Sequence, residues 1–187
     1  MTFGLEGFSA VRPVRVELMT AGHRIDGTIQ TRFSRVAEIL NQLSSTHLPV
    51  DEAEVREHGD QRVWRASSTI VAVNEILAML APDLVDAPSG DMRVPKQPVR
   101  ARIAIPPVWL AGTIYVPVGS SPSDGLLNLA DRFVPMTDVT VTSSAFPGLD
   151  QTGPVAAVRR DRAHIIQFEG EAPAPGDSSV LVRDEAG

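Results

Sequence analysis

Apolar and polar residues alternate along several short segments of the chain, which is the pattern of strands with one buried face. Residues 14–19 (VRVELM) and 24–30 (RIDGTIQ) alternate in this way, and 21–23 (AGH) suits a turn between them, so we predict a hairpin. In 35–43 (RVAEILNQL) the apolar residues recur with helical spacing. Ser34 precedes this segment, in the position of a helix cap.

Further apolar segments predict more strands. Residues 52–55 (EAEV) alternate, and we expect a third strand there. Residues 62–67 (RVWRAS) and 69–74 (TIVAVN) are predicted to pair as a second hairpin. Near the end of the chain, 155–158 (VAAV) and 163–168 (AHIIQF) are predicted to form the corresponding hairpin.

The chain repeats its own pattern. The segment RIDGTI at 24–29 returns as WLAGTI at 109–114, 85 residues later. Further blocks match in the same order: 38–43 with 125–130, 47–55 with 133–141, and 68–80 with 153–168. Such ordered repeats indicate duplication of one small unit. The alternative is that both halves use the same strand and turn pattern without common ancestry.

These patterns predict a mainly β fold with short helices (α+β), made of two tandem duplicated small β domains. Each domain should have about four to five strands plus one helix, and in the second copy Ser121 or Ser123 can cap that helix. The expected boundaries are an N-terminal arm at 1–13, a first domain at 14–85, a linker at 86–98, a second domain at 99–169 and a disordered tail at 170–187.

Each copy carries a glycine within a predicted strand, Gly27 in the first and Gly112 in the second. A glycine inside a strand marks a bulge or a bend, or lets another backbone approach closely. We therefore assign both glycines a structural role rather than contact with a ligand.

The composition is that of a globular protein with an aliphatic core. Apolar residues make up 43% of the 187 residues, but aromatic residues only 5%. The chain has no cysteine, which excludes disulfides, thiolate metal sites and cysteine nucleophiles. A basic region followed by an apolar run is missing from the first residues, and the sequence contains no apolar run of membrane-spanning length. We expect a cytoplasmic protein without a membrane span.

The charge disfavours nucleic acid as a partner. The formal net charge is −6 and the sequence pI is about 5.2, so the chain as a whole does not attract phosphate backbones. Arginines still cluster at 93–102 and 159–162, where a local basic patch is possible.

Motifs for catalysis, cofactors or metals are missing. The loop at 119–125 (GSSPSDG) lacks the lysine of a phosphate-binding loop. The four histidines form neither H-x-x-x-H nor H-x-H, and the chain has no G-x-S-x-G. We predict no catalytic, cofactor-binding or metal-binding residues, and therefore no cofactor.

A few residues are candidates for interaction instead. Trp64 and Trp109 are conspicuous in so aromatic-poor a chain and suit either a core or an interface. Arg159, Arg160 and Arg162 form the densest basic stretch, which the first copy lacks. Arginine forks there would suit a phosphate or a carboxylate, and a solvated turn is the alternative.

The segments GTI…EILN…LPVDEAEV…VAVN and GTI…LLN…FVPMTDVTV…AHIIQF resemble a loosely patterned bacterial small β domain of unknown function, present here in two tandem copies. This resemblance implies no activity. A more distant resemblance is to Sm-like domains, through the order of Gly27 and Asn41. It would imply ring assembly and RNA binding, but Sm-like domains carry their helix at the front, whereas here the helix falls between strands.

The sequence therefore favours a non-enzymatic assembly or accessory module, which oligomerises or binds another protein through its β domains. The partner would be the chain itself or another protein. The alternative is a regulatory or ligand-binding module, including Sm-like nucleic-acid binding. An enzyme is the third class, and it is disfavoured because the two copies share no cluster of polar residues.

Overall fold

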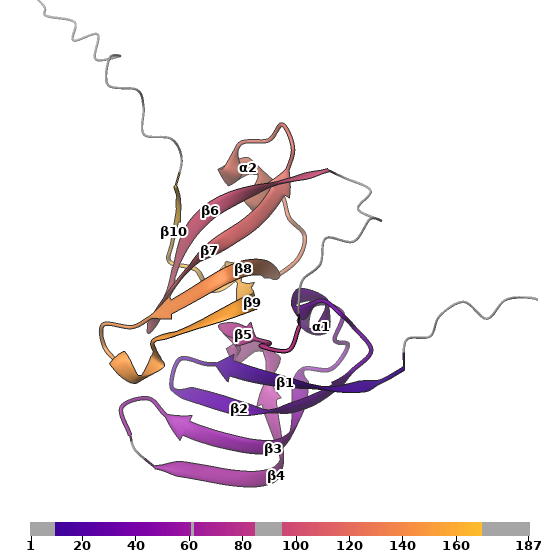
Figure 1. Ribbon diagram of the computed structural model, residues 1–187, viewed down its shortest axis with the longest axis vertical. Helices are drawn as coiled ribbons and strands as arrows, with labels where there is room; N and C mark the ends of the chain where they lie inside the picture. Colours follow the sequence, from indigo (N-terminus) through magenta and orange to yellow (C-terminus); the bar gives the residue numbers. More distant parts are fainter. Residues whose placement is uncertain (1–9, 61, 85–94, 170–187) are drawn as a thin grey trace, which may run out of the picture.

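The computed structural model describes residues 10–60, 62–84 and 95–169. Within these residues the strands form one ten-stranded antiparallel sheet in the order β10-β6-β7-β8-β9-β5-β1-β2-β3-β4 (Figure 1). The strands are β1 (Arg12–Met19), β2 (His23–Thr31), β3 (His47–Glu57), β4 (Val63–Ala72), β5 (Ala78–Leu80), β6 (Lys96–Ile105), β7 (Val108–Pro117), β8 (Phe133–Thr142), β9 (Gln151–Arg159) and β10 (Ile165–Phe168).

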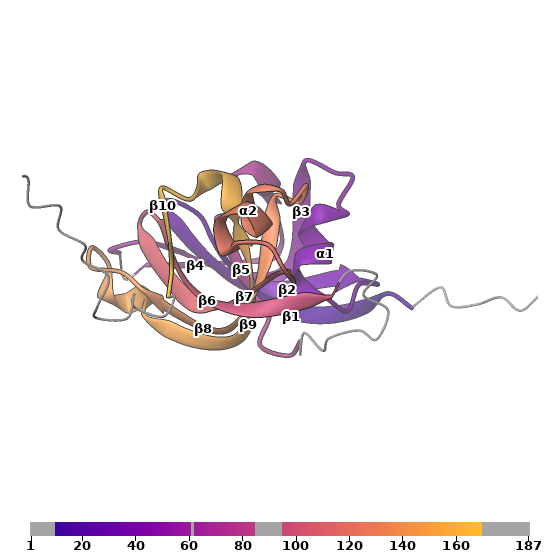
Figure 2. The ribbon, with the colours of Figure 1, turned by 90° about the horizontal axis from the view of Figure 1, so that it is seen from above.

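The mainly β prediction is confirmed, but the α+β description is wrong because the described residues contain only two short α-helices. These are α1 (Val36–Asn41), between β2 and β3, and α2 (Pro122–Leu127), between β7 and β8. Short 3-10 turns, η1 (Val73–Glu75), η2 (Pro147–Leu149) and η3 (Arg160–Arg162), join further strands. Figure 2 shows α1 and α2 on the same side of β1 and β6. Neither helix is long and apolar enough to cross a membrane.

The two halves are not separate domains, since β5 of the first half pairs with β9 of the second and makes the sheet continuous. Strands β1 and β6 begin slightly earlier than expected, inside the predicted arm and linker. Residues 1–9, most of the predicted linker and the predicted tail lie outside the described residues.

The halves share one strand order and one register. Val16 lies opposite Gly27 in the first half, and Ala101 lies opposite Gly112 in the second, at the 85-residue offset read from the sequence. The last strand of each half then returns to the first strand of that half. Leu18 faces Met79 there, and Ile103 faces Ile166, so β5 and β10 correspond at an offset of 87.

Each half has a β-bulge beside its strand glycine. A Cβ atom on Gly27 would lie 2.4 Å from Val50 Cγ1, and one on Gly112 would lie 2.7 Å from a backbone oxygen of β8. Across from the glycines, Glu52 and Asp138 adopt left-handed backbone angles, with φ of 49° and 53°. The backbones therefore approach each other where only glycine leaves room.

Two predicted hairpins are wrong. Residues 63–72 form one continuous strand, because the whole segment pairs with β3 and no turn residue interrupts it. Strands β9 and β10 do not pair with each other, since η3 redirects the chain and β10 pairs with β6. The cap predicted at Ser34 is also wrong: α1 starts after Arg35 without a side-chain cap. Ser121 does cap α2, accepting a hydrogen bond from the Asp124 N–H at 3.1 Å.

The apolar core consists of two clusters, and each includes residues of the other half. The cluster under the first half contains Phe133, Val155 and Ala157 from the second half. The cluster under the second half contains Met19 and Leu77 from the first half, among others. Burial across the β5–β9 joint therefore makes the two halves depend on each other.

Candidate functional site

The internal joint, defined as the pairing of β5 with β9, is short and apolar. Ala78 faces Val158, Met79 faces Ala157 and Leu80 faces Ala156, and all six side chains are buried. Backbone hydrogen bonds from Arg159 N to Leu77 O (2.9 Å) and from Ala81 N to Val155 O (3.3 Å) extend the ladder at both ends. Small alanines on β9 leave room for the larger Met79 and Leu80 beside them.

Helix α1 closes the joint from one side. The Asn41 side-chain amide donates to the Phe133 carbonyl at 2.8 Å, and the Phe133 N–H donates to Asn41 Oδ1 at 3.0 Å. One side chain thereby satisfies both backbone groups of the first residue of β8. Leu40 beside it is 3% exposed. Sequence reasoning missed Asn41 as a joint residue, although an asparagine recurs at the matching place of both repeats.

Arg159 also ties the halves together. Its side chain is buried, and its guanidinium donates to the carbonyls of Val73 (3.2 Å) and Asn74 in η1. Asp161 accepts a further hydrogen bond at 2.8 Å, and the Phe133 ring lies 5.8 Å below the guanidinium carbon. The hydrogen bonds to Arg159 lower the pKa of the Asp161 carboxyl.

The other two arginines of this stretch also have partners within the chain. Arg160 donates to carbonyls at the end of α2, including Leu126 O at 2.9 Å and Leu129 O at 2.8 Å. Arg162 lies 3.7 Å from the Glu75 carboxylate of the first half. All three arginines therefore hold parts of the molecule together.

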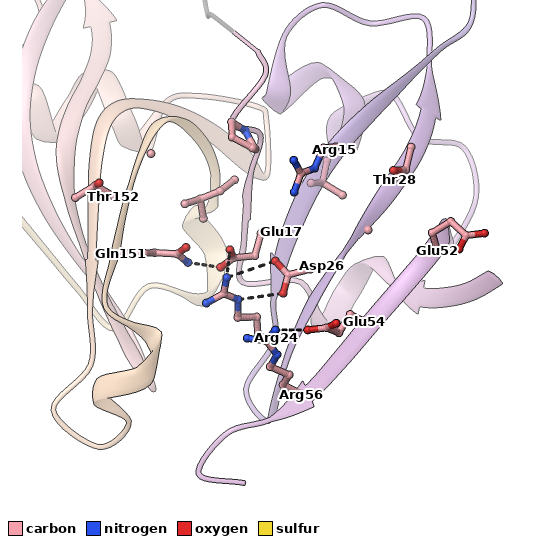
Figure 3. Close-up of a pocket in the computed structure, with 15 residues that line it drawn as sticks. Arg15, Glu17, Arg24, Asp26, Thr28, Glu52, Glu54, Arg56, Gln151 and Thr152 are labelled. Carbon is pink, nitrogen blue, oxygen red and sulfur yellow. Dashed lines mark hydrogen bonds and ion pairs between the residues drawn. The ribbon is translucent and has the colours of Figure 1, made fainter. Parts of the chain in front are cut away.

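A groove of about 580 Å³ runs along the opposite side of the joint (Figure 3). Arg24 contacts Glu17 at 2.7 Å and Asp26 at 3.2 Å, and Gln151 of the second half donates to Glu17. Burial raises the pKa of the Glu17 carboxyl, although Gln151 and Arg24 oppose this shift. The side chains that meet here are therefore already bonded to one another.

The outer wall of the groove is a second ionic cluster. Arg56 donates to Glu54, and Arg65 lies 2.8 Å from the same carboxylate (Figure 3 labels Glu54 and Arg56). The hydrogen bonds from both arginines lower the pKa of Glu54. Among the described residues, no three His, Asp or Glu side chains are grouped to hold a metal ion. The groove is therefore lined by an ion-pair network, and Gln151 links this network to the second half through Glu17.

The two tryptophans occupy different settings. Trp64 lies on β4 and is 45% exposed, with the Arg62 guanidinium carbon 5.5 Å from its ring centroid. Trp109 lies on β7 and is half-buried, with Arg102 at the same distance. Trp64 is therefore the one that stands at the surface of an edge strand.

The free edges, defined as the outer sides of β4 and β10 that no described strand pairs with, lie at opposite ends of the sheet (Figure 1). Ile70 on β4 is 66% exposed and Ile165 on β10 is 48% exposed. Leu127 at the end of α2 is 69% exposed. Edge strands present unpaired backbone groups, and here they do so beside large apolar side chains.

The described residues thus contain one internal joint, between β5 and β9, and two edge strands, β4 and β10, that correspond to the strands of this joint. The joint uses paired backbones, a helix and a buried arginine, and none of these supplies a reactive group. Comparison with protein-family models, with curated proteins and with solved structures finds no match for this chain.

Proposed function

We propose that the protein is a non-enzymatic assembly module, built from two copies of one small β unit within a single sheet, that binds another polypeptide by strand pairing at its free edges. One observation carries this proposal. The two halves are themselves joined by edge pairing of β5 with β9. The strands that correspond to these two, β10 and β4, each have one side without a partner strand among the described residues. The kind of edge that pairs inside the chain is thus repeated at both ends of the sheet.

The matching registers support duplication. The offsets of 85 in the first two strands and 87 in the last strands hold pair by pair, with both bulges and both glycines in the same places. A shift of one residue would turn every side chain to the other face, so chance similarity would rarely keep so many pairs aligned.

The outward backbone groups of β4 are suited to pairing. On β9, the Arg159 N–H donates to the first half and the Val155 carbonyl accepts from it. Every second residue of β9, including Ala157, therefore points its N–H and C=O toward β5. Ile70 lies opposite Pro49 as Ala157 lies opposite Pro135, so Ile70 belongs to the corresponding row. Its N–H and C=O therefore point outward, where an added strand would bind them.

The double variant Ile70→Lys/Ile165→Lys tests this function in the full-length chain. A lysine on each edge should block strand addition, as charged edge residues do in natural sheets. We expect native mass spectrometry of the unchanged protein, purified from its own cells, to show complexes that the variant does not form. The circular-dichroism spectrum should stay the same, because both side chains are exposed.

The variant Val11→Lys/Val118→Lys is the matched control, since it adds the same charge at exposed apolar positions away from both edges. We expect it to keep the complexes. A monomer that carries a small molecule or RNA, with no protein partner at any concentration, would contradict the proposal and favour the ligand-binding alternative.

A further inference from the structure

We infer that the partner at each free edge is a second copy of this chain, with β10 of one chain pairing with β4 of the next in the register of the internal joint. This rests on the proposed function and adds the partner and the geometry. The structure supplies the template, because the β5–β9 joint shows how the last strand of one copy meets the fourth strand of another.

The register follows from the correspondence of the halves. Met79 of β5 corresponds to Ile166 of β10, because each pairs with the same position of the first strand of its half. Val71 of β4 corresponds to Val158 of β9, because each pairs with the same position of the third strand of its half. Transferring the internal joint to the outer edges then gives three pairs between chains: Ile165 with Val71, Ile166 with Ile70, and Gln167 with Thr69. The exposed Ile70 and Ile165 would both become covered.

Helix α2 would take the role of α1. Leu40 is 3% exposed because α1 lies against the second half, whereas the matching Leu127 is 69% exposed. Asn128 matches Asn41 and is exposed, and His47 matches Phe133 as the first residue of the third strand. We therefore place the Asn128 amide against the backbone of His47 in the next chain, where it would bond the C=O and would replace Ser45 Oγ, which accepts from the His47 N–H at 3.1 Å in the single chain.

A third contact would involve the exposed Trp64, although in the single chain Arg62 lies against its ring and Arg102 lies against Trp109. Inside the chain, Gln151 donates to Glu17 across the joint. The matching residues are Trp64, because it faces Val55 as Gln151 faces Val141, and Arg102, because it pairs with β10 as Glu17 pairs with β5. An arginine over a tryptophan ring is a favourable cation–π pair. The outer joint thus exchanges one polar contact for another.

The outer joint should be weaker than the internal one. Ala72 stands where the internal joint has the buried Arg159, so the ties to the η1 carbonyls are missing. His47 and Ser68 also replace Phe133 and Val155 of the internal core. Fewer buried apolar groups make the association reversible and concentration-dependent.

Head-to-tail pairing of this kind uses a different surface on each side of the contact. It closes into a ring when the rotation from chain to chain allows it, and a ring leaves no sheet edge open. Each chain then contributes two copies of the domain to the assembly.

Engineered cysteine pairs test the register in the full-length protein, which has no cysteine of its own. Leu80 and Ala156 form a non-hydrogen-bonded pair of the internal joint, so Thr69 and Gln167 should form the matching pair between chains. Cα atoms in such pairs are about 4.5 Å apart, within reach of a disulfide. We expect Thr69→Cys/Gln167→Cys to give disulfide-linked multimers under mild oxidation, which a reducing agent separates.

The control Thr69→Cys/Ile166→Cys moves one cysteine by one residue, to the other face of the sheet. We expect it to cross-link at least tenfold less. Equal cross-linking of both variants would overturn the register. Multimers that form normally while the matched pair stays unlinked would overturn the register. A different protein found on the edges would overturn the second-copy partner but leave the proposed function standing. A protein that stays monomeric and binds no other protein would refute both.

A second readout uses the helix contact. Asn128→Ala should weaken association about tenfold in sedimentation equilibrium, since it removes the hydrogen bonds that this amide makes across the interface. Its thermal midpoint as a dilute single chain should not change, because the side chain is exposed in the single chain. Unchanged association would remove α2 from the interface and contradict the inferred geometry.

Discussion

Asn41 shows how much one side chain contributes to the joint between the halves. Its amide satisfies both backbone groups of Phe133, whose side chain is buried in the first core cluster. Asn41→Ala should lower the free energy of unfolding by about 1–3 kcal/mol, the cost of leaving buried backbone groups unpaired. Urea unfolding measures this change. Gln42→Ala on the same helix end is the control, and an equal loss in both variants would contradict a specific role of Asn41.

Glu17 makes stability depend on pH. Burial raises its pKa above the usual 4.5, so the folded protein binds this proton more tightly than the unfolded chain does. The stabilisation is complete below pH 4.5 and is lost as pH rises through the folded pKa. We therefore expect the free energy of unfolding of Glu17→Gln, measured in urea, to rise relative to that of the unchanged protein as the pH increases from 4.5 to neutrality.

Glu54 provides the opposite case on the same groove. The hydrogen bonds from Arg56 and Arg65 lower its pKa, so its contribution is present above pH 4.5 and is lost as pH falls through the folded pKa. Glu54→Gln should therefore cost more stability at neutral pH than in acid. If both variants followed the same pH trend, the opposed environments of these carboxylates would be ruled out.

The strand glycines Gly27 and Gly112 each permit a β-bulge in the pairing of two strands. Gly27→Ala would place a methyl group 2.4 Å from Val50 Cγ1 and 2.9 Å from Asp51 O. We expect the free energy of unfolding to fall by about 1–3 kcal/mol through overcrowding. Gly22→Ala is the control, since nothing lies within 4 Å of its added methyl group. Thermal unfolding that is equal in both variants would disprove the close-approach role.

Local elements could be predicted from the sequence where the pattern itself determines them. The hairpin of β1 and β2, the place of both helices and the Ser121 cap follow from periodicity and capping preference. The partners of β4 and β10 could not be predicted, because strand pairing over long sequence distances leaves no mark in local periodicity. Residues 62–74 read as a hairpin for this reason, although β3 holds most of them in one strand.

The whole molecule determines what the candidate residues do. The arginine stretch suggested a surface for a partner, but the fold brings Arg159 against η1 and Arg162 against Glu75. Conversely, Leu127 and Ile70 look like ordinary core residues in the sequence and are exposed in the structure. Once the repeat is known, each exposed residue can be compared with its buried counterpart in the internal joint, and this comparison points to the interface.

The dependence of each half on the other leads to a prediction for the separated halves, 1–86 and 95–187. Alone, the first half loses Phe133, Val155 and Ala157 from its core, and the second half loses Met19 and Leu77. We therefore expect neither half alone to show a cooperative thermal transition at the midpoint temperature of the whole chain. Mixed in equal amounts, the halves should reform the β5–β9 joint and recover a cooperative transition in thermal circular dichroism.

Asn41→Ala in the first half should reduce this recovery, because the amide that holds β8 would be missing, whereas Asn128→Ala in the second half should leave it intact. The two asparagines occupy matching places in the repeat, so the contrast separates the internal joint from the outer one. Halves that unfold cooperatively alone, at the temperature of the whole chain, would mean that they are independent domains and that the shared core contributes little.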